Sequence, residues 1–164
     1  MKFLHINECT EWCRDHGMET ADHGFELLDD PKLNTKARIL FAWEKSTGLE
    51  PRVLESCIRA FAQWDECLLW VTGTGVWANS EDWPALYDLR KARGERTSLD
   101  NKPGHLFFKN EEADLRSFLL IMLNNGWDVF VLPIKDGVSS RRIDISHDGY
   151  VDLLTPKAEP FELA

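Results

Sequence analysis

The chain has 164 residues, of which 43% are hydrophobic and 29% are charged, and it contains seven tryptophans. These proportions are typical of a globular protein and exclude a disordered chain, a collagen and a coiled coil. A chain of this length predicts a single globular domain over residues 1–164, with residues 155–164 as a candidate surface arm.

The apolar runs and the cysteines indicate a cytoplasmic protein. The longest apolar runs, 67–71 and 118–123, are far shorter than the roughly 20 residues of a membrane span. The first residues contain no basic segment followed by an apolar stretch, so we expect no signal peptide. The four cysteines, at positions 9, 13, 57 and 67, are too few and too scattered for a disulfide framework, so we expect free thiols.

The net charge of −9 is unevenly distributed along the chain. Residues 1–30 carry eight acids against two bases, and residues 143–164 carry five acids against one base. The one basic cluster, between residues 90 and 109, is small against this acidic total, so we expect no nucleic-acid binding. An acidic surplus favours attraction to basic proteins.

Helices and strands alternate along most of the chain. Apolar residues at a spacing of three or four predict a helix over 7–16 that ends at Gly17, and Pro51 begins a second helix with an apolar stripe. The acidic turn after Asn110 and the closing Gly126 delimit the clearest helix, at 111–125. The other predicted elements are strands at 37–43, 67–71 and 105–109 and a helix within 80–93.

The last predicted elements form a hairpin. The strands 129–132 and 142–145 flank Asp136-Gly137, a dipeptide suited to the left-handed conformations of a tight turn. Because the preceding strands alternate with helices, we expect an α/β or α+β fold. Its sheet would be mixed and partly parallel, flanked by helices and closed by this antiparallel hairpin.

The segment Gly73-Thr74-Gly75-Val76-Trp77-Ala78 follows a predicted strand and fits the letters of the dinucleotide fingerprint G-x-G-x-x-G/A. The next helix begins several residues too late for its amides to face a pyrophosphate, and Trp77 is bulky where phosphate would approach. We therefore interpret the segment as a glycine turn. No Gly-Lys-Ser or Gly-Lys-Thr follows, which excludes a P-loop, and we expect no cofactor.

His5, Cys9, Cys13 and His16 have the spacing H-x3-C-x3-C-x2-H, which suggests metal ligands. Four ligands on one straight helix cannot reach a single zinc ion, because the helix rises about 1.5 Å per residue. A smaller set of Cys13 and His16 completed by His23 stays open, but the cysteines are more simply explained as a buried stripe. We expect no metal site.

Four side chains form the most reactive candidate site, and we assign them a catalytic role: His105, Asp128, His147 and Asp148. If the strands at 105–109 and 128–134 are parallel, both begin at one edge of the sheet, and the returning hairpin strand ends there too. Two imidazoles and two carboxylates suit general acid–base chemistry or a two-His, one-carboxylate metal site. Alternatively, the residues around Asp128 and His147 only cap turns.

With parallel strands, the glycine turn would leave the opposite, carboxyl edge of the sheet. Ligands of open α/β sheets bind at that edge, whereas the side-chain chemistry favours the histidine edge. We expect the His105 and His147 rings to lie close together at a concave surface that includes Trp127.

Tryptophan is several times more frequent here than usual. Trp77, Trp83 and Trp127 lie in or beside predicted loops, where a large amphipathic ring often contacts a partner. We assign these three a partner-binding role, with core packing as the alternative.

Short motifs spread over residues 68–150, about half of the chain, carry a resemblance. They are Leu69-Trp70-Val71-Thr72, Gly75-Val76-Trp77, Ser80-Glu81, Leu89-Arg90, Pro103-Gly104-His105-Leu106-Phe107, Gly126-Trp127-Asp128 and Ser146-His147-Asp148. The set resembles a group of small uncharacterised bacterial proteins. The resemblance implies a bacterial cytoplasmic protein and brings no activity, cofactor or catalytic residue with it.

A small, acidic, tryptophan-rich chain without a recognisable nucleophile or cofactor motif favours a non-catalytic protein that binds another protein, such as a toxin-neutralising immunity protein. Its partner would be another protein of basic character, and no nucleic acid or membrane is expected. The alternative is a small hydrolase or phosphotransfer enzyme that uses the four His and Asp residues. The sequence leaves the oligomeric state open.

Overall fold

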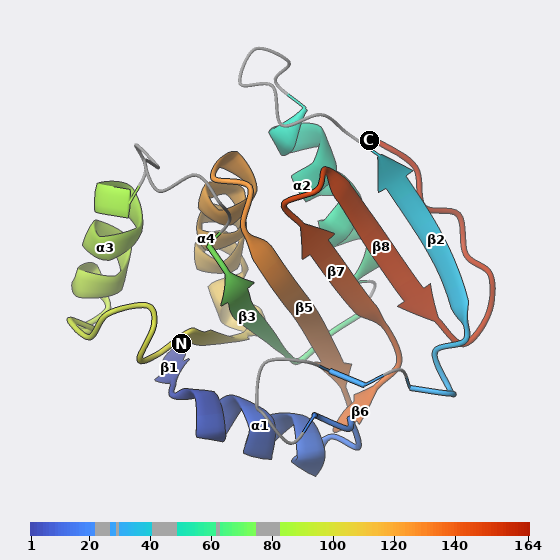
Figure 1. Ribbon diagram of the computed structural model, residues 1–164, viewed down its shortest axis with the longest axis horizontal. Helices are drawn as coiled ribbons and strands as arrows, with labels where there is room; N and C mark the ends of the chain where they lie inside the picture. The colour runs from blue at the N-terminus through green and yellow to red at the C-terminus, as the bar shows by residue number, and fades with distance from the viewer. Residues whose placement is uncertain (22–26, 29, 41–48, 62, 75–82) are drawn as a thin grey trace.

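The computed structural model describes residues 1–21, 27–28, 30–40, 49–61, 63–74 and 83–164 (Figure 1). The helices are α1 (Ile6–Asp15), α2 (Glu50–Ala60), α3 (Trp83–Ala92), the 3-10 turn η1 (Lys109–Glu111) and α4 (Glu112–Asn124). The strands are β1 (Lys2–Leu4), β2 (Thr35–Leu40), β3 (Glu66–Gly73), β4 (Gly104–Phe108), β5 (Asp128–Lys135), β6 (Val138–Ser139), β7 (Arg142–Ser146) and β8 (Tyr150–Thr155).

The strands of the described segments form one eight-stranded sheet with the order β1-β4-β3-β5-β7-β8-β2, and β6 pairs with β5. Every pairing among them is antiparallel. The prediction of helices with a sheet is therefore confirmed as a mixed α+β fold, but the prediction of parallel neighbours is wrong. β4 and β5 do run in the same direction, and the oppositely directed β3 lies between them.

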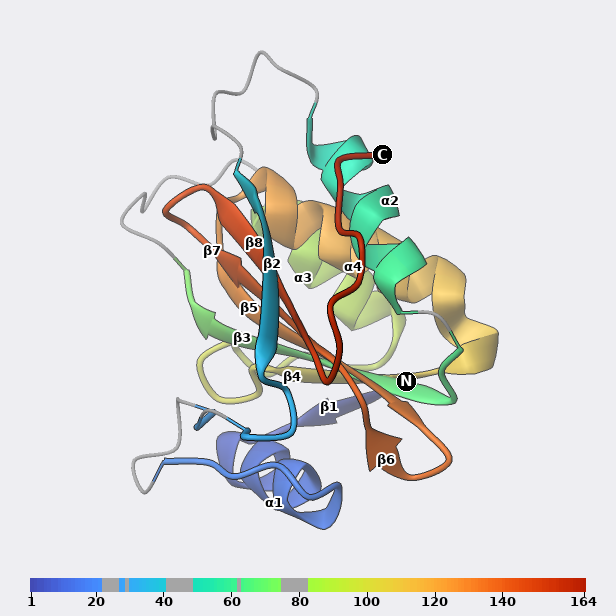
Figure 2. The same cartoon turned by 90° about the vertical axis from the view of Figure 1, so that its right-hand side faces the viewer.

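Helices cover one face of the sheet with the larger part of the core. Figure 2 shows α2 and α4 side by side on this face, with α3 behind them. Cys67, Leu69 and Val71 of β3 point into this layer and pack with Phe118 of α4 and Cys57 of α2. Apolar stripes at helical spacing therefore bury against the alternate residues of the strands.

The other face of β3 and β5 is covered by α1. Leu68 and Trp70 of β3 share a second buried cluster with Cys9 and Cys13 of α1. β3 is thus buried on both faces, which explains why its sequence is a continuous apolar run instead of an alternating one.

The closing hairpin is confirmed. Asp136 and Gly137 both have a positive φ, 51° and 75°, in the turn after β5. β5 then pairs with β7, with Val129 opposite Ile145. The predicted strand 37–43 corresponds to β2, of which residues 41–43 lie outside the described residues. Within the described part of the chain, no helix combines the length and the apolar character that crossing a membrane requires.

Candidate functional site

The last residue of β3 and the first residue of β5 bring two predicted sites together. Gly73 pairs with Asp128, with a register irregularity after Val71. The prediction that the glycine turn and the His147 edge lie at opposite ends of the sheet is therefore wrong. It assumed parallel strands, whereas an antiparallel β3 ends where β5 begins. Residues 75–82 of the glycine segment lie outside the described residues.

Asp128 and His147 form the centre of this site. The backbone N–H of His147 donates to Asp128 Oδ1 at 2.9 Å, and ring Nδ1 lies 2.9 Å from each carboxylate oxygen. The His147 side chain is 37% exposed and that of Asp128 28% exposed. The pair is therefore fixed by the backbone and still reaches solvent.

A second carboxylate lies on the other side of the ring. Asp148 Oδ1 is 3.4 Å from His147 Nε2, and the Asp148 side chain is largely exposed. The hydrogen bond to Asp128, its negative charge and the charge of Asp148 together raise the pKa of His147 above its ordinary value. Because Nδ1 is hydrogen-bonded to Asp128, Nε2 is the ring nitrogen that can exchange a proton or contact a ligand.

The close approach of Asp128 leaves no room for a Cβ at Gly73 unless the carboxylate moves. A Cβ at position 73 would lie 2.6 Å from Asp128 Oδ2. Beside it, the Thr72 hydroxyl donates to the Asp128 carbonyl at 3.4 Å. The glycine thus makes room for the carboxylate that orients His147.

His105 is enclosed in a different environment. It is fully buried, its ring stacks edge-on against Phe3 and tilts against Phe118, and its Nε2 lies 2.7 Å from Arg90 Nη1. Burial, followed by the Arg90 charge, lowers the pKa of His105 to about 3. The ring is therefore neutral and accepts from Arg90 through Nε2, while Nδ1 donates to the Pro103 carbonyl at 3.2 Å. The structure does not bring it to His147 at a shared surface.

Arg90, to which the sequence assigned no role at a site, organises this region. Its guanidinium is fully buried, donates to the carbonyls of Lys102 and Thr97, and lies over the Phe3 ring at 4.9 Å. The spacing of Leu86 and Arg90 on one face of α3 was the available signal, because Leu86 is buried as well.

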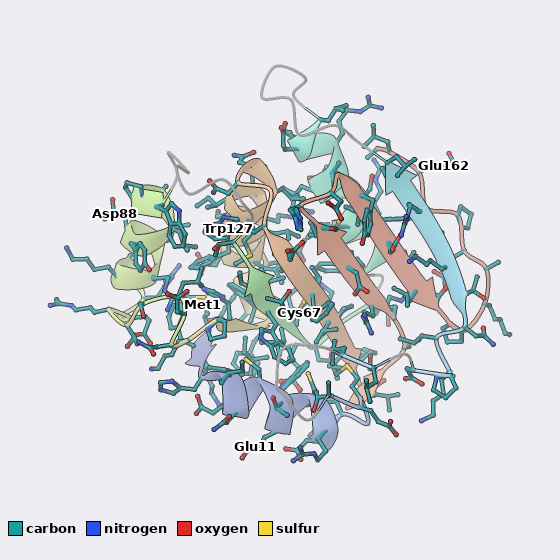
Figure 3. The ribbon with its side chains drawn as sticks, in the orientation of Figure 1. Met1, Glu11, Cys67, Asp88, Trp127 and Glu162 are labelled. Atoms are coloured by element: carbon teal, nitrogen blue, oxygen red, sulfur yellow. The ribbon has the colours of Figure 1, made fainter. Side chains whose placement is uncertain are left out.

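The three predicted partner-binding tryptophans have different surroundings. Trp127 is completely buried and lies between α3 and β5 (Figure 3), which leaves it no exposed surface for a partner. Trp83 is partly buried, and its ring centroid lies 4.8 Å from that of Trp127. Trp77 lies outside the described residues.

The cysteines and histidine of α1 that have metal-ligand spacing take part in packing and hydrogen bonding. Cys9 and Cys13 are fully buried, while His16 bonds to the Trp12 carbonyl and to Glu66. His23 lies outside the described residues, and among those described no three His, Cys, Asp or Glu side chains are grouped to hold a metal ion. Burial raises the pKa of all four thiols, that of Cys57 to about 12, so they are protonated at neutral pH and are poor nucleophiles.

The outer face of α1 carries a row of carboxylates that the sequence reasoning recorded only as charge. Glu8, Glu11 and Asp15 are exposed at helical spacing, and exposed Glu19 follows the helix. Figure 3 shows Glu11 at the outer rim of α1, away from the sheet. None of the four carboxylates forms an ion pair with a described residue, and the row is here called the acidic face of α1.

No protein-family model, curated protein or solved structure matches the chain.

Proposed function

We propose that the protein binds a basic protein partner without catalysing a reaction, in the manner of a toxin-neutralising immunity protein. The acidic face of α1 is the observation that carries this proposal. Its carboxylates lack internal cationic partners in the described structure, so they are available to the cations of another protein. An acidic protein surface raises the association rate with a basic partner and selects against acidic ones.

The helix that bears these carboxylates is held firmly. Cys9 and Cys13 on its inner face are fully buried against the sheet. At its beginning, the His5 N–H donates to Glu8 Oε2 at 2.6 Å, and the Thr10 hydroxyl donates to the Ile6 carbonyl at 3.0 Å. A preorganised charged face loses little conformational entropy on binding, which supports a role in recognition.

The proposal is tested by affinity purification from the native host, followed by binding measurements on the recovered partner. The variant Glu11→Lys/Asp15→Lys reverses two charges on the acidic face of α1. The matched control Asp88→Lys/Asp100→Lys makes the same charge change at exposed positions on and after α3. We expect the α1 variant to weaken binding about tenfold or more, mainly at low salt, and the control to retain affinity.

Two results would contradict the proposal. One is a recovered partner that is acidic and binds independently of salt. The other is equal weakening by both variants, because the effect would then follow net charge and not the face of α1.

The Asp128–His147 pair favours a second candidate, a small hydrolase or phosphotransfer enzyme. In that case His147 Nε2 would take a proton from water while Asp128 orients the ring, and Asp148 would flank the site. The test is hydrolysis of p-nitrophenyl acetate and p-nitrophenyl phosphate. His147→Gln and Asp128→Asn should each remove most of the rate, and His5→Gln, at an exposed histidine on another part of the surface, should not. A rate unchanged by His147→Gln removes this candidate.

A further inference from the structure

A cavity of about 440 Å³ lies between α2 and the segment 156–164, remote from both candidate sites. Figure 2 shows this segment running from the end of β8 along the side of α2. The cavity has the size of a small-molecule site, for which a few hundred cubic ångströms suffice.

The wall formed by the segment 156–164 is fixed by specific contacts. Arg141 donates to both carboxylate oxygens of Glu159, at 3.0 and 3.2 Å. The buried Ser56 hydroxyl donates to the Glu162 carbonyl and accepts from the Ala164 N–H, both at 2.9 Å. Phe161 is 9% exposed and belongs to the main core. The predicted surface arm is therefore packed against the domain at this point.

The lining of the cavity combines an apolar floor with four charged side chains, two of each sign. Leu153, Phe161 and Ala60 supply the apolar surface. Arg141 and Glu159 neutralise each other, whereas the side chains of Arg59 and Glu162 form no hydrogen bond or ion pair with any described residue. One free cation and one free anion beside an apolar surface are complementary to a small zwitterion.

We propose that this cavity binds a free amino acid with a large apolar side chain. Its carboxylate pairs with Arg59, its ammonium group pairs with Glu162, and its side chain lies on Leu153 and Phe161. This site is independent of the proposed protein partner. The cavity lies on the face of the sheet that α2 and α4 cover, whereas α1 lies on the opposite face.

The experiment measures binding of three probes to the full chain by calorimetry at low salt. L-phenylalanine carries both charges, 3-phenylpropanoate lacks the ammonium group, and 2-phenylethylamine lacks the carboxylate. We expect L-phenylalanine to bind up to about fivefold more tightly than either analogue, because each analogue forms only one of the two solvent-exposed ion pairs. Amide NMR shifts should move at Ala60 and Phe161.

Variants assign the two charges. Arg59→Gln should weaken L-phenylalanine binding by up to about fivefold and remove its advantage over 2-phenylethylamine. Glu162→Gln should remove the advantage of L-phenylalanine over 3-phenylpropanoate. Both side chains are exposed, so the fold should persist, which the melting temperature checks. Arg14→Gln on α1 is the control. Absence of saturable binding at millimolar L-phenylalanine, equal binding of the three probes, or unchanged binding by Arg59→Gln overturns the proposal.

Discussion

Gly73 and Asp128 face each other at the edge of the sheet, where the end of β3 meets the start of β5. Asp128 also holds the ring and the backbone of His147. The glycine turn and the His147 pair are therefore parts of one site, because the bare backbone of Gly73 leaves the space that the Asp128 carboxylate occupies.

Replacing Gly73 by Ala tests this relationship. The new Cβ would overlap Asp128 Oδ2, so the carboxylate must move, and we expect Gly73→Ala to lower the free energy of unfolding by about 1–3 kcal/mol. Urea denaturation measures the loss. In an Asp128→Ala background the same substitution should cost clearly less, because the clashing atoms are gone. An undiminished cost in that background would place the conflict elsewhere.

The pH dependence of stability should report the His147–Asp128 pair. The pKa of His147 is raised in the folded protein relative to about 6.5 in the unfolded chain. The stability that the charged ring contributes is therefore fully present below about pH 6.5. It is lost as the pH rises through the folded pKa. We expect Asp128→Asn to lower the His147 pKa in an NMR titration of the ring and to remove this decline in urea midpoint. An unchanged titration in the variant would show that Asp128 does not hold the imidazolium.

Leu119→Ala tests the packing of α4 on the sheet. Leu119 is fully buried, so truncation should cost about 2–5 kcal/mol in unfolding free energy. The neighbouring Leu120 is only partly buried, and Leu120→Ala provides a matched control with a smaller loss. Equal losses for the two variants in denaturant titrations would contradict the orientation of the helix.

The helix ends could be predicted because their signals are local. The prediction of a helix at 111–125 agrees with α4 at Glu112–Asn124. Gly17 and Gly126, which end predicted helices, both have a positive φ in the structure. Such signals depend on a few neighbouring residues, so helix ends can be predicted from the sequence alone.

Strand direction could not be predicted in this way, because it depends on partners far apart in the chain. β3 pairs with β4 and β5, more than thirty residues away along the chain, and no local pattern encodes the direction of either pairing. β8 was missed because Asp152 interrupts its apolar pattern. Asp152 is buried in the sheet, where its carboxylate forms ion pairs with Lys36 and Arg38 of β2. These two residues lie more than a hundred positions earlier in the chain.

The candidate site could be predicted only in part, because some of its contacts are local and others come from distant parts of the chain. Asp128 and His147 meet because the hairpin β5–β7 is a local unit with a recognisable turn. His105 is the second residue of β4, one residue after the strand begins, but Phe3 and Arg90 from other elements enclose it. Burial by distant elements turns a residue with catalytic chemistry into a core hydrogen-bond acceptor.

His105 therefore predicts a second, opposite pH effect. Its folded pKa is lowered to about 3, so below about pH 6.5 the unfolded chain takes up a proton that the folded protein does not. Stability from this residue is complete above that pH and is lost as the pH falls. His105→Gln keeps an acceptor for Arg90 but cannot titrate. We expect the stability difference between wild type and His105→Gln to shrink on acidification, with a slope approaching about 1.4 kcal/mol per pH unit.

The comparison isolates His105 because all other titratable groups are shared by the two proteins. Glu95, whose hydrogen bonds with Lys102 and Thr97 outweigh burial and lower its pKa to about 2, loses its contribution equally in both. Urea denaturation at closely spaced pH values between about 4 and 8 gives the difference directly. A difference that does not change with pH would mean that the folded protein protonates His105 beside Arg90, and the neutral, Arg90-accepting ring described above would be wrong.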